Sequence, residues 1–148
     1  MKDINGIYII TEEGKILFNH ELYIQGSDMI DSSLFSNFVL SIQQFSKTIG
    51  EKQANRIELG KSKVFISKDK EKKIIFVVRS SKSANNKKML NNLKQIQKKF
   101  IKKFDSKVIE RYDPDKIKMY IYNLFITEVE KIIKGDLDKN FSEFFDTI

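Results

Sequence analysis

Residues 74–78, with the sequence IIFVV, constrain the fold of this chain more than any other stretch. They form a continuous run of β-branched and aromatic side chains between Lys73 and Arg79. Successive side chains of a strand point to opposite faces of a sheet, so a strand that is apolar at every position must be covered on both faces. The run therefore predicts a central strand in a sheet with helices on both sides.

Four further segments have strand patterns. Residues 7–10 are a second continuous apolar run, and a glycine turn leads from it into a returning strand that includes residues 16–18 and 22–24. Residues 56–59 and 64–66 precede the central run and are expected to form an antiparallel meander with it. Because residues 56–59 are the most polar of these strands, we expect them at an edge of the sheet.

The first helix is expected over residues 31–49, capped by Asp31 or Ser32. The spacing of its apolar residues predicts a buried stripe of Leu34, Phe38, Ile42, Phe45 and Ile49, widened by Phe35 and Val39. Leu40 falls nearly opposite this stripe and is expected to point outward. An outward leucine beside Val39, next to an open edge strand, predicts self-association through this helix and residues 56–59.

The second helix is expected over residues 85–104 and is strongly two-sided. Its predicted buried face consists of Leu90, Leu93, Ile96, Phe100 and Phe104. Its opposite face is rich in lysine and includes Lys87, Lys94, Lys98 and Lys102. Such a cluster is typical of a solvated helix face, and it is also the candidate surface for contact with anionic membranes.

A last long helix is predicted to start at Asp113-Pro114 and to end at Gly135. Its stripe toward the sheet is expected to be Ile117, Ile121, Leu124 and Ile132. A second stripe on another face of this helix consists of Met119, Tyr122, Ile126, Val129 and Ile133. Soluble proteins rarely leave such a stripe in water, so something should cover it.

The candidate cover is an amphipathic tail, residues 137–148, which we expect to be a short C-terminal helix. Its apolar residues are Leu137, Phe141, Phe144, Phe145 and Ile148. We expect the tail to fold back beside the last long helix. The alternative is that the second stripe is a protein–protein interface.

The order of these elements resembles the longin-like domain, a profilin-like α-β-α sandwich close to the roadblock fold. The matching positions are 7–10, 14–18, 34–45, 57–60 and 74–78, together with Leu93, Ile96 and Phe100. The resemblance implies an α+β fold with a five-stranded antiparallel sheet in the order 2-1-5-4-3, one helix on one face and two on the other. Roadblock proteins proper begin with a helix, whereas this chain begins with a strand, so the longin topology fits better.

Length and charge bound the class of protein. A chain of 148 residues predicts one domain, residues 1–148. The formal net charge of +7 comes almost entirely from lysine, since Arg56, Arg79 and Arg111 are the only arginines. Arginine is the preferred residue for reading phosphates and bases, so binding to nucleic acid is disfavoured. Without cysteine, a signal peptide or an apolar run of membrane-spanning length, the chain is expected to be cytoplasmic, with peripheral membrane contact as an option.

No catalytic, cofactor-binding or metal site is expected. His20 is the only histidine, and without cysteine it gives no metal-ligand spacing. Gly60-Lys61-Ser62 lacks the upstream glycine of a phosphate-binding loop. The sequence therefore gives no sign of an enzyme.

The expected function is that of a non-enzymatic protein-interaction module. The resemblance to archaeal longin and roadblock-type proteins that accompany Ras-like GTPases implies a homodimer, or a heterodimer with a related domain, that docks or regulates a small GTPase or a membrane-trafficking component. The candidate partner-binding residues are Val39, Leu40, Arg56, Glu58, Met119, Tyr122, Ile126 and Val129. The alternatives are binding of anionic membranes or nucleic acid through helix 85–104, and a profilin-like small-ligand sensor.

Overall fold

The structure of the chain is a computed structural model that describes residues 4–21, 32–48, 55–69, 71, 73–104 and 114–146. The side chains of residues 32, 114, 115 and 135–146 lie outside this description. The elements along the chain are β1 (Ile4–Thr11), β2 (Ile16–Glu21), α1 (Ser32–Thr48), β3 (Arg56–Glu58), β4 (Ser62–Asp69), β5 (Ile74–Ser81), α2 (Asn86–Lys103) and α4 (Pro114–Asp146).

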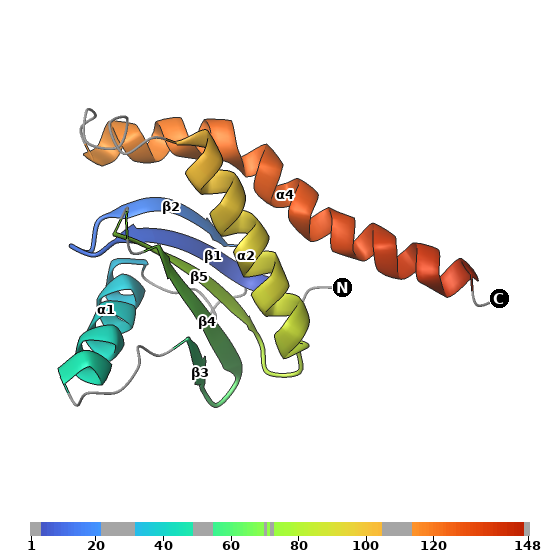
Figure 1. The fold of residues 1–148 in the computed structure, drawn as a ribbon, viewed down its shortest axis with the longest axis horizontal. Helices are drawn as coiled ribbons and strands as arrows, with labels where there is room; N and C mark the ends of the chain where they lie inside the picture. Colours follow the sequence, from blue (N-terminus) through green and yellow to red (C-terminus); the bar gives the residue numbers. More distant parts are fainter. Residues whose placement is uncertain are drawn as a thin grey trace.

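The strands form one five-stranded antiparallel sheet in the order β2-β1-β5-β4-β3. β1 and β5, the two continuous apolar runs, are neighbours in which Ile7 is paired with Val78 and Ile9 with Phe76. α1 lies on one face of the sheet, and α2 and α4 lie on the other (Figure 1). The predicted α+β fold, with its strand order and its division of helices, is confirmed.

The alternation of side chains along β5 divides the core into two clusters. Ile75 and Val77 point toward α1, where they pack with Val39. Ile74, Phe76 and Val78 point toward α2 and α4. Every one of these residues is buried, as expected for a strand covered on both faces.

Aromatic rings fill the space between the sheet and the helices α2 and α4. The Phe125 ring of α4 meets the rings of Phe18, Phe100 and Phe104 at centroid distances of 5.6, 5.4 and 5.8 Å, each in an edge-to-face arrangement. Edge-to-face pairs add to the free energy gained from burial alone. Phe125 is therefore the residue that ties α4 to both α2 and the sheet.

α1 presents a different face to the sheet from the one predicted. Leu34 and Phe45, members of the predicted buried stripe, are 70% and 62% exposed. The buried residues are instead Phe35, Ser36, Val39 and Gln43, and Leu40 is half-buried against the same cluster. The expectation that Leu40 points outward is therefore wrong.

The turn between β1 and β2 explains this rotation of α1. The Ser36 hydroxyl donates a hydrogen bond to the Gly14 carbonyl over 3.4 Å, and Leu40 Cδ1 lies 3.1 Å from where a Cβ on Gly14 would stand. Gly14 has a φ of +96°, which a residue with a side chain rarely adopts. The bare glycine thus lets the turn approach α1 closely.

α2 agrees with its prediction. Met89, Leu93, Ile96 and Phe100 are buried, and Phe104 is buried at its C-terminal end. The helix is capped by Asn85, whose side-chain oxygen accepts a hydrogen bond from the Lys88 backbone N–H over 3.0 Å. Leu90, on the predicted face, is half-buried beside the same cluster.

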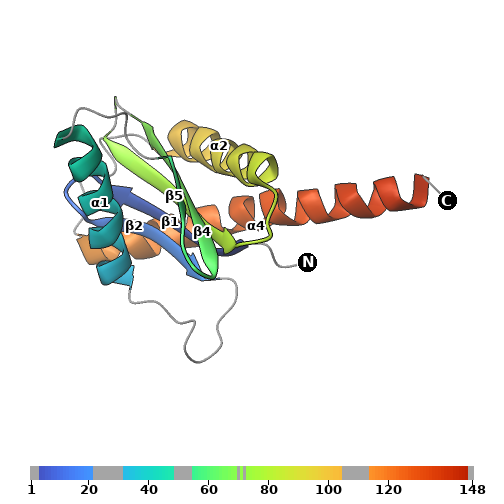
Figure 2. The same ribbon diagram turned by 90° about the horizontal axis from the view of Figure 1, so that it is seen from below.

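α4 is one continuous helix from Pro114 to Asp146, so the prediction that it ends at Gly135 is wrong. Pro114 occupies the first helical position, as predicted. A glycine inside a helix costs about 1 kcal/mol relative to alanine, which does not stop a helix that has already formed. The C-terminal part of α4 extends away from the sheet instead of folding back as a separate short helix (Figure 2).

The buried stripe of α4 consists of Ile117, Ile121, Phe125, Val129 and Ile132. Leu124, expected in this stripe, is 40% exposed, and Val129, expected in the second stripe, is fully buried. The stripe has spacings of four, four, four and three residues and includes Phe125, whose large ring fills the core. The predicted strand residues 22–24 and the side chains of Leu137, Phe141, Phe144, Phe145 and Ile148 lie outside the described residues.

Replacing Phe125 with alanine should lower the free energy of unfolding by about 3–5 kcal/mol, because it leaves a cavity where three other rings meet. Leu124→Ala on the neighbouring, exposed position is the matched control and should change the value by less than about 0.5–1 kcal/mol. Chemical denaturation followed by circular dichroism measures both. Equal losses in the two variants would contradict the packing described.

Candidate functional site

β3 is an edge strand, and no other strand among the described residues lies on its outer side. The Leu59 N–H donates to the Ser62 carbonyl over 2.8 Å, and the Ile66 N–H donates to the Asn55 carbonyl over 2.9 Å. In an antiparallel pair such positions alternate, so the intervening residues Arg56 and Glu58 direct their backbone groups away from β4. Both side chains are exposed and lie 4.0 Å apart, which gives an ion pair of little energetic value.

Two other residues predicted to bind a partner at this end of the sheet lie elsewhere. Val39 is fully buried in the core beneath α1, and Leu40 packs partly against that core. The apolar side chains that α1 does expose are Leu34 and Phe45. The apolar residues that α1 exposes are therefore not the ones that the sequence indicated.

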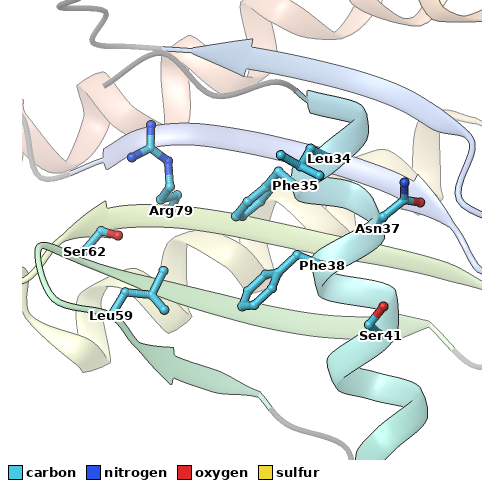
Figure 3. Close-up of a pocket in the computed structure, with 8 residues that line it drawn as sticks. All are labelled: Leu34, Phe35, Asn37, Phe38, Ser41, Leu59, Ser62 and Arg79. Atoms are coloured by element: carbon cyan, nitrogen blue, oxygen red, sulfur yellow. The ribbon is translucent and has the colours of Figure 1, made fainter. Parts of the chain in front are cut away.

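A groove of about 590 Å³ lies between α1 and the end of the sheet that contains β3 (Figure 3). Its lining residues are Leu34, Phe35, Asn37, Phe38, Ser41, Leu59, Ser62 and Arg79. The walls are mainly apolar, and of the lining residues that the structure describes only Arg79 is charged. The volume falls within the usual range of small-molecule pockets, about 300–1,000 Å³.

Arg79 belongs to a buried polar row across the sheet. Gly6 of β1 is paired with Glu21 on one side and with Arg79 on the other. The Arg79 Nη2 lies 3.4 Å from the Glu21 carboxylate, and the Tyr8 hydroxyl donates a hydrogen bond to the same carboxylate. A Cβ at Gly6 would stand 2.7 Å from the Tyr8 hydroxyl, so this row needs a glycine at its centre.

Burial, helped by the hydrogen bond to Glu21, raises the pKa of the Tyr8 hydroxyl, which stays protonated and remains a donor. Glu21 is thus shared between Tyr8 and Arg79. Among the described residues, the Arg79 Nε has no hydrogen-bond partner although it is buried. Leaving such a donor unpaired costs about 1–3 kcal/mol.

The outer surface of α4 contains only part of the predicted second stripe. Met119 is 69% exposed and Tyr122 is also exposed, whereas Ile126 is half-buried and Val129 is fully buried. The Tyr122 ring stacks on Phe18 at 5.7 Å and lies 6.1 Å from the His20 ring. Met119 and Tyr122 are therefore the members of this set that a partner can reach.

The four lysines predicted to form an anionic-surface site, Lys87, Lys94, Lys98 and Lys102, are all exposed on α2. Another lysine of the helix, Lys99, lies 3.7 Å from the Glu128 carboxylate of α4. Contact of this lysine face with an anionic surface stays a prediction.

No group of three or more His, Asp or Glu residues able to hold a metal ion occurs within the described part of the chain. None of the helices that the structure describes is both long enough and apolar enough to cross a membrane.

The groove and its arginine were not predicted from the sequence. Arg79 continues the alternation of Ile75 and Val77 along β5, so its position facing α1 could have been inferred from the strand. The groove itself depends on how α1 is rotated, and that rotation is not visible in the apolar spacing.

The sequence matches no protein-family model and no curated protein. Similar solved structures include MglB of Myxococcus xanthus, 14% identical, with a TM-score of 0.42 over 57% of this chain and 69% of that one. A Roadblock/LC7 domain from Streptomyces avermitilis is 10% identical, with a TM-score of 0.43 over 56% of this chain and 70% of that one. The gliding protein MglB from Thermus thermophilus is 15% identical, with a TM-score of 0.41 over 55% of this chain and 64% of that one.

His20 should make the stability of the fold depend on pH. Burial lowers its pKa, and the weaker opposing effect of Glu130 and Glu21 does not cancel this. Between the unfolded value of about 6.5 and the lower folded value, the unfolded chain binds more protons, so stability falls as the pH falls.

Unfolding free energies measured at about pH 8 and about pH 5.5, above the range in which most carboxylates titrate, test this effect. The loss on acidification should be smaller in His20→Gln than in the unsubstituted protein. An equal loss in both would show that other groups cause the dependence.

Proposed function

We propose that this protein is a non-enzymatic interaction module that forms a dimer, with itself or with a related domain, through β3 and the adjoining surface of α1. The observation that carries this proposal is the open edge at Arg56 and Glu58, whose outward backbone groups have no strand beside them among the described residues. An open edge is a template for pairing with another strand. The exposed Phe45 of α1, which is not among the residues that line the groove, adds apolar surface on the α1 side of the sheet.

The dimer is proposed to dock or regulate a Ras-like small GTPase or a trafficking component. This step is supported by the resemblance of the sequence to longin and roadblock-type proteins. The exposed Met119 and Tyr122 of α4 are the proposed contact residues, on the face of the sheet opposite α1. Docking on α4 and pairing through β3 use separate surfaces, so both can occur in one assembly.

Arg56→Pro should convert the dimer to a monomer. Proline at position 56 removes one outward N–H. The hydrogen bonds from this segment to β4 stay intact, because they are made by the neighbouring residues Asn55 and Leu59. Light scattering coupled to size exclusion, at high micromolar concentration, measures the mass.

Arg56→Thr is the matched control, because it also removes the exposed ion pair but keeps the backbone N–H. It should remain a dimer. A monomeric unsubstituted protein, or a dimer that survives Arg56→Pro, would refute pairing through this edge.

Met119→Asp should weaken capture of the GTPase by roughly tenfold or more, which corresponds to about 1.4 kcal/mol. The immobilised full chain is incubated with native lysate containing either GDP or a non-hydrolysable GTP analogue. We expect the immobilised chain to retain a small GTP-binding protein, in an amount that differs between the two nucleotides.

Thr127→Asp places the same charge at another exposed position of α4 and should capture the GTPase as well as the unsubstituted protein does. If no GTP-binding protein is retained under either nucleotide, the GTPase part of the proposal is wrong. If both variants behave alike, α4 is not the contact surface.

A further inference from the structure

The groove between α1 and the β3 end of the sheet has features that dimerisation through the edge does not use. Pairing through β3 involves the outward backbone of Arg56 and Glu58, whereas the groove opens over the α1 face of the sheet. Its volume of about 590 Å³ is suited to a small molecule.

Arg79 stands at one end of this groove, with its side chain rising beside Phe35 (Figure 3). The residue is only 7% exposed, so its charge is largely removed from water. Glu21 contacts Nη2 over a long 3.4 Å, and the buried Nε has no acceptor among the described residues. A guanidinium has several N–H donors and commonly serves two acceptors at once.

The carboxylate of Glu21 does not fill this deficit, because it contacts Nη2 of Arg79 and not Nε. Glu21 is not among the described residues that line the groove, and none of those residues is acidic. A ligand in the groove therefore meets a guanidinium that is ion-paired with Glu21 through Nη2 but whose Nε has no described acceptor, and no acidic residue among the described lining residues. This favours a head group that is a single anion.

The rest of the groove favours a hydrocarbon chain. Phe35 and Phe38 stack with ring centroids 6.4 Å apart and form one wall, and Leu59 stands opposite on the sheet side (Figure 3). Leu59 is 38% exposed, and covering it removes apolar surface from water. The polar lining groups, those of Asn37, Ser41 and Ser62, carry no charge.

We propose that the groove binds a single-chain carboxylate amphiphile, of which a free fatty acid is the simplest example. The carboxylate accepts hydrogen bonds from the Arg79 guanidinium, and the chain lies between the two phenylalanines and Leu59. This makes the protein a ligand-binding module in addition to its proposed interaction with partners.

Decanoate and 1-decanol test the proposal directly, because they share one chain and differ in the charged head. Calorimetric titration of the full-length protein at about pH 8, where the fatty acid is ionised, should give binding of decanoate at least about tenfold tighter than that of decanol, or roughly 1.4 kcal/mol. Equal binding of the two would overturn the role of Arg79. The absence of any binding of decanoate would overturn the site.

Two variants separate the head from the chain. Arg79→Gln should weaken decanoate about tenfold and leave decanol unchanged, provided that circular dichroism shows the variant folded. Leu59→Asp should weaken both ligands. Leu124→Asp, at a leucine of nearly equal exposure on the opposite side of the sheet, is the control and should weaken neither.

The competing occupant is a second copy of the chain. If decanoate does not bind and Leu59→Asp turns a dimer into a monomer, the groove is an interface between protomers and the proposal fails. If decanoate binds Arg56→Pro with the same affinity as it binds the unsubstituted protein, the site is independent of edge pairing, as proposed. This holds whether or not the protein dimerises.

Discussion

β5 is apolar on both of its faces, and this requirement organises the whole molecule. Exposing either face would leave several large side chains in water, so the strand has to lie inside the sheet and between layers of helix. β1 has the same character and pairs directly with β5. With these two strands inside, the more polar β2 and β3 are left as the two edges.

The two faces of the sheet are covered unequally. α2 and α4 together cover one face, and their rings converge on Phe125. On the other face α1 is the only helix among the described residues, and one helix cannot cover five strands. The groove lies beside α1, over a part of the sheet that this helix does not cover. Arg79 follows Ile75 and Val77 along the same face of β5, so a charge stands where the apolar row ends.

Sequence patterns predicted helix faces only where polar and apolar residues are cleanly separated. α2 was predicted correctly because its lysines and its apolar residues occupy different sides. α1 has a wide apolar stripe with Leu40 outside it, and the contact of Ser36 and Leu40 with Gly14 accompanies its rotation, a long-range effect that spacing does not reveal. The same limit applies to the site. The exposure of Arg56, Glu58, Met119 and Tyr122 agrees with the prediction, whereas Val39 and Val129 are buried.

α4 is a single long helix that does not end at its glycine. The described part of the helix is anchored by buried residues from Ile117 to Ile132, and the helix continues beyond Ile132 for roughly 20 Å, at about 1.5 Å per residue. Starting a helix is the costly step, and adding residues to an existing one is cheap, so Gly135 interrupts nothing. The anchoring residues face the sheet, which leaves Met119 and Tyr122 exposed on the side away from the groove. A partner on α4 and a ligand beneath α1 are therefore held apart by the sheet, and each can bind without displacing the other.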